Sequence, residues 1–104
     1  MEDAFCDKYG YTRENLILSH ILCSKGCEFS VDFAAEDANI SELEAQKIVD
    51  EFECKGWIKK TQVYRNRQLY TPNMENKDVQ EWYRRFMACL KKALKDYKEP
   101  ITAE

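Results

Sequence analysis

The chain has 104 residues, of which 44% are hydrophobic and 34% are charged, and this composition fits one domain with a modest core. No stretch approaches the ~18 consecutive apolar residues of a membrane-spanning helix, so we expect no membrane partner. The first residues lack the basic start and apolar core of a secretory signal, so we expect the five scattered cysteines to be reduced thiols in the cytoplasm.

The formal net charge of −3 is unevenly distributed along the chain. Residues 1–55 carry 13 acidic and five basic side chains, for a net charge of −8. Residues 56–104 carry six acidic and 11 basic side chains, for a net charge of +5. The C-terminal half can therefore bind phosphate groups, although the pI of the whole chain is about 5.3.

The N-terminal part predicts a loose helical turn followed by a first long helix. The turn ends at Gly10, and Thr12 caps a helix over residues 13–24 with apolar residues on one side. We expect this helix to end at Gly26, because glycine readily adopts the left-handed conformation that follows many helices.

A short second helix is predicted over residues 31–38, with Ser30 as its cap. Asn39 follows it in a turn, where we expect a positive φ because asparagine tolerates that conformation. Residues 27–29 are too few to classify by themselves.

The third predicted helix starts at Ser41 and stops at Gly56. Ser41 and Glu44 have the Ser-x-x-Glu spacing of a capping box. Three- and four-residue spacings favour a single core-facing side made of Leu43, Ala45, Ile48, Val49 and Phe52.

Two strands are predicted over residues 57–61 and 68–71, where β-branched and aromatic side chains concentrate. The connecting wing covers residues 63–67, and Asn66 is its best candidate for a left-handed backbone. Near Asn76 begins a final helix over residues 77–98, which we expect to end before Pro100.

The apolar stripe of this final helix is longer than one small domain needs to bury. A symmetric partner is the simplest explanation, and the alternative is a helix that folds back onto its own domain. We expect the homodimer interface to contain Leu16, Trp82, Phe86, Met87, Leu90, Leu94 and Tyr97.

Four short segments within residues 31–71 carry a family resemblance. They are Phe33-Ala34-Ala35, Ala38-Asn39-Ile40-Ser41, Phe52-Glu53-Cys54-Lys55-Gly56-Trp57-Ile58 and Leu69-Tyr70-Thr71-Pro72. In this order they resemble the winged helix-turn-helix regulators of the ArsR, MarR and PadR type. The resemblance implies one mainly α domain with a small β-hairpin wing: an N-terminal extension (residues 1–11), a winged-helix core (12–73) and a long C-terminal dimerisation helix (76–99).

In proteins of this kind the helix after the turn enters the major groove and the wing reaches the backbone or the minor groove. The resemblance therefore implies double-stranded DNA as a partner. Gln46 can pair with adenine, and Lys47 can reach guanine or a phosphate. The expected DNA contacts are Ser41, Glu44, Gln46, Lys47, Lys59, Lys60, Tyr64, Arg65, Asn66 and Arg67.

These features favour a dimeric, sequence-specific DNA-binding protein, either a transcriptional regulator or a binder of operators or centromeres. The third helix, however, also carries Glu42, Asp50 and Glu51, and carboxylates near phosphates cost Coulomb energy. The alternative is a winged-helix protein–protein interaction module that uses this acidic helical face without binding DNA.

We predict no enzymatic activity, no cofactor and no metal. The sequence has one histidine, three glycines and no phosphate-binding loop. His20, Cys23 and Cys27 are loosely spaced, without a paired Cys-x-x-Cys, so a surface histidine and small thiols explain them better than a metal site.

Overall fold

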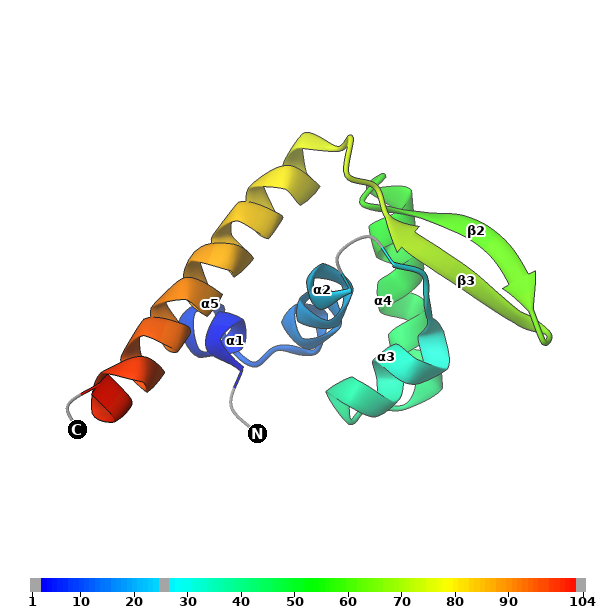
Figure 1. Ribbon diagram of the computed structural model, residues 1–104. Coiled ribbons are helices and arrows are strands. Elements are labelled where there is room, and N and C mark those ends of the chain that lie inside the picture. The colour runs from blue at the N-terminus through cyan, green and yellow to red at the C-terminus, as the bar shows by residue number, and fades with distance from the viewer. Residues whose placement is uncertain (1–2, 25–26, 103–104) are drawn as a thin grey trace.

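The computed structural model describes residues 3–24 and 27–102, and side chains up to residue 95. These ranges form a mainly helical chain with a small sheet, which confirms the predicted fold class (Figure 1). The elements are α1 (Ala4–Tyr9), α2 (Arg13–Cys23), β1 (Phe29–Ser30), α3 (Val31–Ala38), α4 (Glu42–Cys54), β2 (Ile58–Tyr64), β3 (Arg67–Pro72) and α5 (Lys77–Thr102). No helix in the described part of the chain is both long and apolar enough to cross a membrane.

Side-chain caps start α2, α4 and α5 at the predicted positions, whereas Ser30 precedes α3 without a side-chain capping hydrogen bond. The Thr12 hydroxyl accepts a hydrogen bond from the Asn15 backbone N–H at 3.1 Å, and the Ser41 hydroxyl accepts one from the Glu44 N–H at 3.1 Å. Asn76 Oδ1 caps α5 by accepting at 2.8 Å from the second residue of that helix. Each bond satisfies a backbone donor that the first helical turn leaves unpaired.

The turn between α3 and α4 has the predicted geometry. Asn39 has φ 57° and ψ 46°, and its N–H still bonds to the end of α3. This single left-handed residue turns the chain so that α3 and α4 pack as a helix-turn-helix pair. Gly56, with φ 78°, ends α4 in the same way. The expected stop at Gly26 lies outside the described residues.

The three strands form one antiparallel sheet in the order β1-β3-β2. Phe29 of β1 pairs with Tyr70 of β3, and Ile58 of β2 pairs with Pro72 at the other end of β3. The two-residue strand β1 therefore ties the start of α3 to the hairpin.

The hairpin is longer than the sequence predicts. Strand pairing continues to Tyr64 and Arg67, so the connection is a two-residue turn at Arg65 and Asn66. Both residues have positive φ, at 51° and 64°. This is the requirement of a type I′ turn, whose twist matches that of the flanking strands and so permits pairing up to the tip.

The core lies between α1, α2, α3, α4, the root of the sheet and the inner side of α5. Phe5 of α1 is 1% exposed, and its ring lies 5.8 Å from Trp82 and 5.9 Å from Phe86, centroid to centroid. These aromatic contacts fasten the N-terminal helix to α5, whose C-terminal end runs on past α1 (Figure 1).

Two predictions about helices are wrong. Leu43 is 70% exposed, whereas Ala45, Ile48, Val49 and Phe52 are buried. At ~100° per residue, Leu43 lies about 180° from Phe52 and so faces away from the core. Helix α5 also continues through Pro100 to Thr102. Proline lacks the N–H that would bond four residues back and its ring crowds that carbonyl, so the last turn of α5 includes Pro100 at a cost in energy.

Candidate nucleic-acid interface

The β2–β3 hairpin, called the wing from here on, presents a cation at its tip that is held by an aromatic ring. The Arg65 guanidinium lies 5.3 Å from the centroid of the Tyr64 ring, a cation–π contact. Tyr64, Arg65 and Asn66 are all exposed. In Figure 1 the wing projects away from α5 and beyond the helices, so the tip is open to a large partner.

Arg67, one residue further on, is bound to the body of the domain. Its Nη1 lies 2.5 Å from Asp32 Oδ2 in the first turn of α3. A hydrogen bond from Ser30, followed by the nearby charge of Arg67, holds the pKa of the Asp32 carboxyl below its usual range. The Asp32 contribution to stability is therefore complete above its ordinary pKa and is lost as the pH falls through the lowered value.

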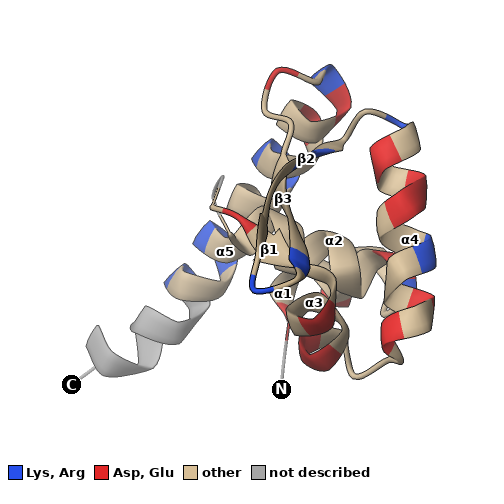
Figure 2. Cartoon of the chain, turned by 90° about the vertical axis from the view of Figure 1, so that its right-hand side faces the viewer, with Lys and Arg blue, Asp and Glu red and all other residues tan. Residues whose placement is uncertain are grey.

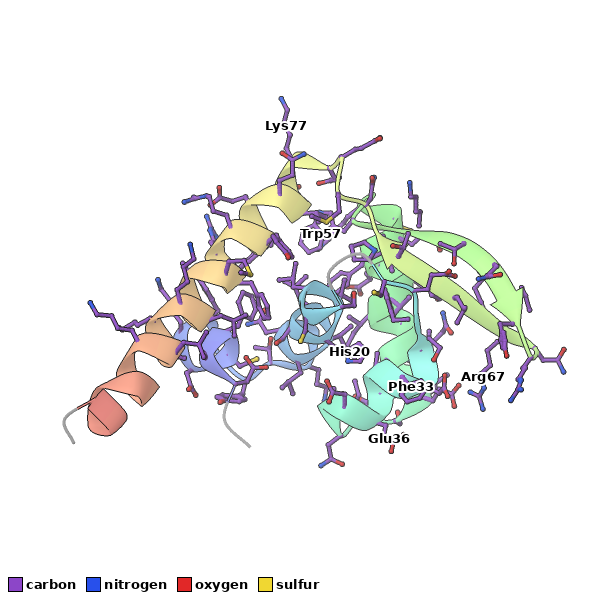
Figure 3. The ribbon with its side chains drawn as sticks, viewed as in Figure 1. His20, Phe33, Glu36, Trp57, Arg67 and Lys77 are labelled. Atoms are coloured by element: carbon purple, nitrogen blue, oxygen red, sulfur yellow. The ribbon has the colours of Figure 1, made fainter. Side chains whose placement is uncertain are left out.

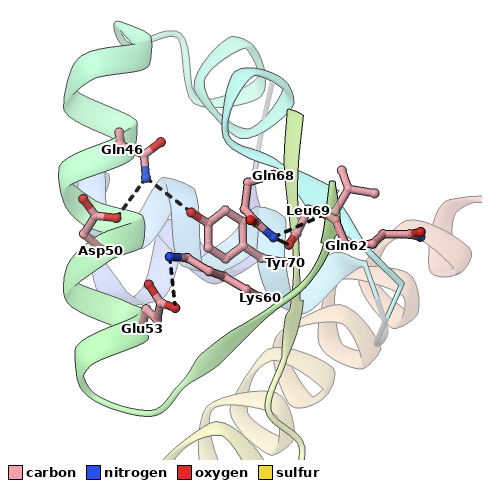
Figure 4. Close-up of polar contacts among 8 residues, drawn as sticks. All are labelled: Gln46, Asp50, Glu53, Lys60, Gln62, Gln68, Leu69 and Tyr70. Carbon is pink, nitrogen blue, oxygen red and sulfur yellow. Dashed lines mark hydrogen bonds and ion pairs between the residues drawn. The ribbon is translucent and has the colours of Figure 1, made fainter. Parts of the chain in front are cut away.

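Gln46, the predicted adenine reader on α4, is occupied by contacts within the chain. Its Nε2 donates to Asp50 Oδ1 at 2.9 Å and to the Tyr70 hydroxyl at 3.4 Å (Figure 4). The amide can pair with a base only if it releases these partners.

The rest of the exposed side of α4 is acidic. Lys47 is its only lysine or arginine, whereas Glu42, Asp50 and Glu51 are all exposed. Glu44 forms an ion pair with Arg13 of α2. Figure 2 shows acidic residues along α4 and on α3, and basic residues at the wing. Phosphates are therefore repelled from most of α4 and attracted at Lys47 and at the wing.

The two lysines at the root of the wing point in different directions. Lys60 Nζ lies 4.0 Å from Glu53 Oε2 of α4 (Figure 4). Lys59 is exposed and precedes it in the strand, where successive side chains alternate between the two faces. Lys60 therefore faces α4, and the structure does not bring Lys59 to the same side.

A hollow of about 340 Å³ separates the wing tip from the starts of α3 and α4. Its lining brings together four of the predicted contacts, which are Gln46, Arg65, Asn66 and Arg67. It also contains Asp32 and Glu42. Of the other predicted residues, Ser41 is exposed where it caps α4.

Sequence reasoning missed two features beside the wing. Asp32 pairs with a residue 35 positions away, a relation that has no local signal in the sequence. Phe33, labelled with Arg67 in Figure 3, is 66% exposed. Both residues line a second hollow of about 460 Å³ between the wing and the helices α2 and α3. The exposure of Phe33 has no signal in the sequence, because Phe33 stands beside two other apolar residues, Ala34 and Ala35, and only those two are buried.

The residues expected at a dimer interface divide into two groups. Phe86 is 4% exposed and Trp82 is half-buried, both against the chain's own Phe5. Leu94 is 60% exposed, and Leu16, Met87 and Leu90 are partly buried against the core. The side chain of Tyr97 lies outside the described part.

The described residues contain no group of three or more histidine, cysteine or acidic side chains arranged to hold a metal. His20 Nδ1 instead lies 2.9 Å from Asp37 Oδ2. Cys6 is buried, and burial, followed by the nearby Asp3 carboxylate, raises the pKa of its thiol to about 11.

The sequence matches no protein-family model and no curated protein. Several solved structures nevertheless share its fold. One is Lactococcus lactis ZitR, a zinc-responsive MarR family member, which has been solved as a variant in complex with DNA. That structure matches with a TM-score of 0.59 at 15% identity, over 80% of this chain and 57% of the ZitR chain. The haem sensor protein PefR from Streptococcus agalactiae, in complex with haem, matches with a TM-score of 0.56 at 16% identity, over 93% of this chain and 68% of that one.

A smaller protein also matches. Sso10a-2, a DNA-binding protein from Sulfolobus solfataricus, gives a TM-score of 0.53 at 20% identity, over 88% of this chain and 93% of that one. At such identities the likeness establishes the fold, which is a winged helix-turn-helix.

Proposed function

We propose that this winged helix-turn-helix chain is a dimeric, sequence-specific DNA-binding protein that regulates transcription. The observation that carries the proposal is the exposed cationic tip of the wing, where Arg65 and Asn66 lie across a shallow hollow from the start of α4. An arginine on a projecting turn suits phosphate contact and insertion into a narrow minor groove. The DNA complex of ZitR, which has the same fold, supports the choice of ligand.

The wing supplies most of the affinity in this proposal, and α4 supplies a smaller part. Lys47 is the one cation on α4 and can reach a phosphate or guanine. Gln46 reads a base only after leaving Asp50, and Glu44 remains with Arg13. Ser41, Lys59, Lys60 and Tyr64 complete the proposed surface at its edges.

A second copy of the chain would pair through α5. Leu94 is 60% exposed, and the helix extends past α1 into space that no other described element fills (Figure 1). Two copies double the number of phosphate contacts and set the spacing between half-sites. Leu16, Trp82, Met87, Leu90 and Tyr97 lie along the proposed interface, and Phe86 supports it from the core.

The dimer is tested by solution mass. Leu94→Gln is expected to shift the mass measured by analytical ultracentrifugation from dimer toward monomer. The matched control is Met74→Gln, which also replaces an exposed apolar side chain by a polar one, but in the loop before α5. A wild-type chain that sediments as a monomer at all concentrations would refute the dimer.

DNA binding itself is tested by a salt titration. Fluorescence anisotropy with a labelled duplex from upstream of the protein's own gene, and with a scrambled duplex, measures both affinity and specificity. If Lys47, Arg65 and Arg67 of two copies each neutralise a phosphate, log K falls with log salt with a slope of about −5. No binding to either duplex at low salt would sink the proposal.

Removing the carboxylate that holds Arg67 is expected to strengthen DNA binding. Asp32→Asn keeps the side-chain shape but abolishes the ion pair. Arg67 then no longer has to give up the Asp32 carboxylate before it binds a phosphate. Exposed ion pairs are worth up to about 1 kcal/mol, so affinity should rise up to about fivefold per copy in the same anisotropy assay. Asp37→Asn, which removes an equal charge that faces His20, should have a smaller effect.

A second candidate function has an observation of its own. Phe33 and Leu43 are 66% and 70% exposed on α3 and α4, where carboxylates predominate. Such a surface suits a partner protein with apolar side chains and lysines or arginines. In that case the chain would bind no duplex even at low salt, and Leu43→Ser would weaken capture of the protein partner.

A further inference from the structure

Glu28 connects the body of the domain to the middle of the wing. Its Oε2 accepts a hydrogen bond from the Thr61 hydroxyl at 2.6 Å. Gln62 Nε2 donates to both carboxylate oxygens, at 3.0 and 3.1 Å. The carboxylate thus binds two consecutive residues of β2 that are more than 30 positions away in the sequence.

These two residues form an irregularity in the hairpin. Lys60 pairs with Tyr70, but the next pair is Val63 with Gln68. Two residues of β2, Thr61 and Gln62, therefore face one residue of β3, which is the arrangement of a β-bulge. A bulge bends its strand and increases the local twist, so its geometry sets the direction of everything beyond it.

The opposite strand supports the bulge as well. Gln68 Nε2 donates to the Gln62 carbonyl at 3.3 Å. It also donates to the carbonyl of Leu69, the residue that follows Gln68 in β3, at 2.8 Å (Figure 4). The bulge is thus bonded from β3 on one side and by Glu28 on the other. Of these supports, only Glu28 lies outside the hairpin.

Glu28 itself is anchored. It directly precedes β1, which pairs with β3, and the preceding Cys27 N–H bonds to the Ser24 carbonyl at the end of α2 at 3.0 Å. Its carboxylate therefore fixes the bulge relative to the helices. Arg65 and Arg67 lie beyond the bulge, so the direction of the wing tip relative to α4 depends on this link together with the Arg67–Asp32 ion pair.

We infer that Glu28 is the positioning residue of the wing: it holds the Thr61–Gln62 bulge so that the arginines at the tip lie at the correct distance from α4 for one duplex. The inference rests on the proposed DNA-binding function. It assigns to a carboxylate the role of strengthening the binding of a polyanion, which is the opposite of its expected electrostatic effect.

Charge and positioning therefore predict opposite effects of removing Glu28. Removing a negative charge near DNA raises affinity if charge alone matters. Glu28→Ala is instead expected to weaken duplex binding, on the order of tenfold, by anisotropy. Glu36→Ala is the matched control, since it removes an equal charge from an exposed position on α3 and should leave affinity equal or slightly higher.

Three further measurements separate positioning from a general structural effect. Glu28→Gln keeps one acceptor oxygen and should restore part of the affinity. Gln62→Ala, which breaks the link from the other side at an exposed position, should weaken binding as Glu28→Ala does. In an Arg65→Ala, Arg67→Ala background, Glu28→Ala should have no further effect, because the groups that it positions are gone.

Amide hydrogen exchange on the free protein tests the link without DNA. Residues 61–64 should exchange faster in Glu28→Ala, while the core helices keep their protection. A wild-type chain that binds no duplex would refute the proposed function. The exchange measurement needs no DNA, so it would still show whether Glu28 holds the bulge. Unchanged exchange, or binding by Glu28→Ala as tight as that of the wild type, would overturn the inference.

Discussion

Replacing Arg65 and Arg67 together by alanine is expected to reduce duplex affinity on the order of a thousandfold at 0.1 M salt. In a dimer this double substitution removes four of the six proposed phosphate contacts. Each contact contributes about 0.9 to the slope of log K against log salt, so the slope should become shallower by 3 to 4. Anisotropy titrations at several salt concentrations measure both quantities.

The control for this experiment removes the same charge elsewhere. Lys91→Ala with Lys95→Ala deletes two exposed cations from α5, on the far side of the molecule from the wing tip (Figure 1). Its affinity should fall far less than that of the wing variant. Equal losses in the two variants would mean that net charge, and not the wing, governs binding. An unchanged affinity in the wing variant would remove the wing from the interface.

Phe5→Ala is expected to lower the free energy of unfolding by about 3–5 kcal/mol, the usual cost of truncating a buried aromatic side chain. Phe5 is 1% exposed and its ring contacts Tyr9, Trp82 and Phe86, with centroids 4.9 to 5.9 Å away. Its loss leaves a cavity between α1 and α5 and detaches the two helices from each other. Urea denaturation followed by circular dichroism measures the change.

Phe33→Ala provides the matched comparison, because it is the same substitution at a side chain that is 66% exposed. Its effect on unfolding should stay within about 0.5 kcal/mol. If the two variants have similar stabilities, α1 does not pack against α5 in solution. A long α5 would then have its apolar side free along most of its length.

The fold could be predicted because its boundaries depend on local chemistry. Thr12, Ser41 and Asn76 cap helices with bonds to residues two or three positions ahead, and Asn39 needs only a tolerance of positive φ. Such signals are complete within a short stretch of sequence. Leu43 lies two, five, six and nine residues from Ala45, Ile48, Val49 and Phe52, so the three- and four-residue spacing that joins those four side chains itself excludes Leu43 from the buried face.

The candidate site was harder to predict, since its chemistry depends on distant pairs. Gln46 was chosen as a base reader from its position on α4, but Tyr70, 24 residues away, is among the groups that hold its amide. The roles of Asp32 and Glu28 follow from Arg67 and from Thr61, which are 35 and 33 residues further along the chain. Only the folded chain reveals these partners.

The backbone at Arg65 has a consequence for the evolution of the hairpin. Its φ of 51° costs an L-amino acid with a Cβ atom about 1–2 kcal/mol, and asparagine followed by glycine is the sequence that favours this kind of turn. Selection for thermostability alone would thus replace Arg65 with asparagine. The guanidinium of Arg65 therefore stands where the backbone favours a different side chain, and Arg65→Asn is expected to stabilise the hairpin.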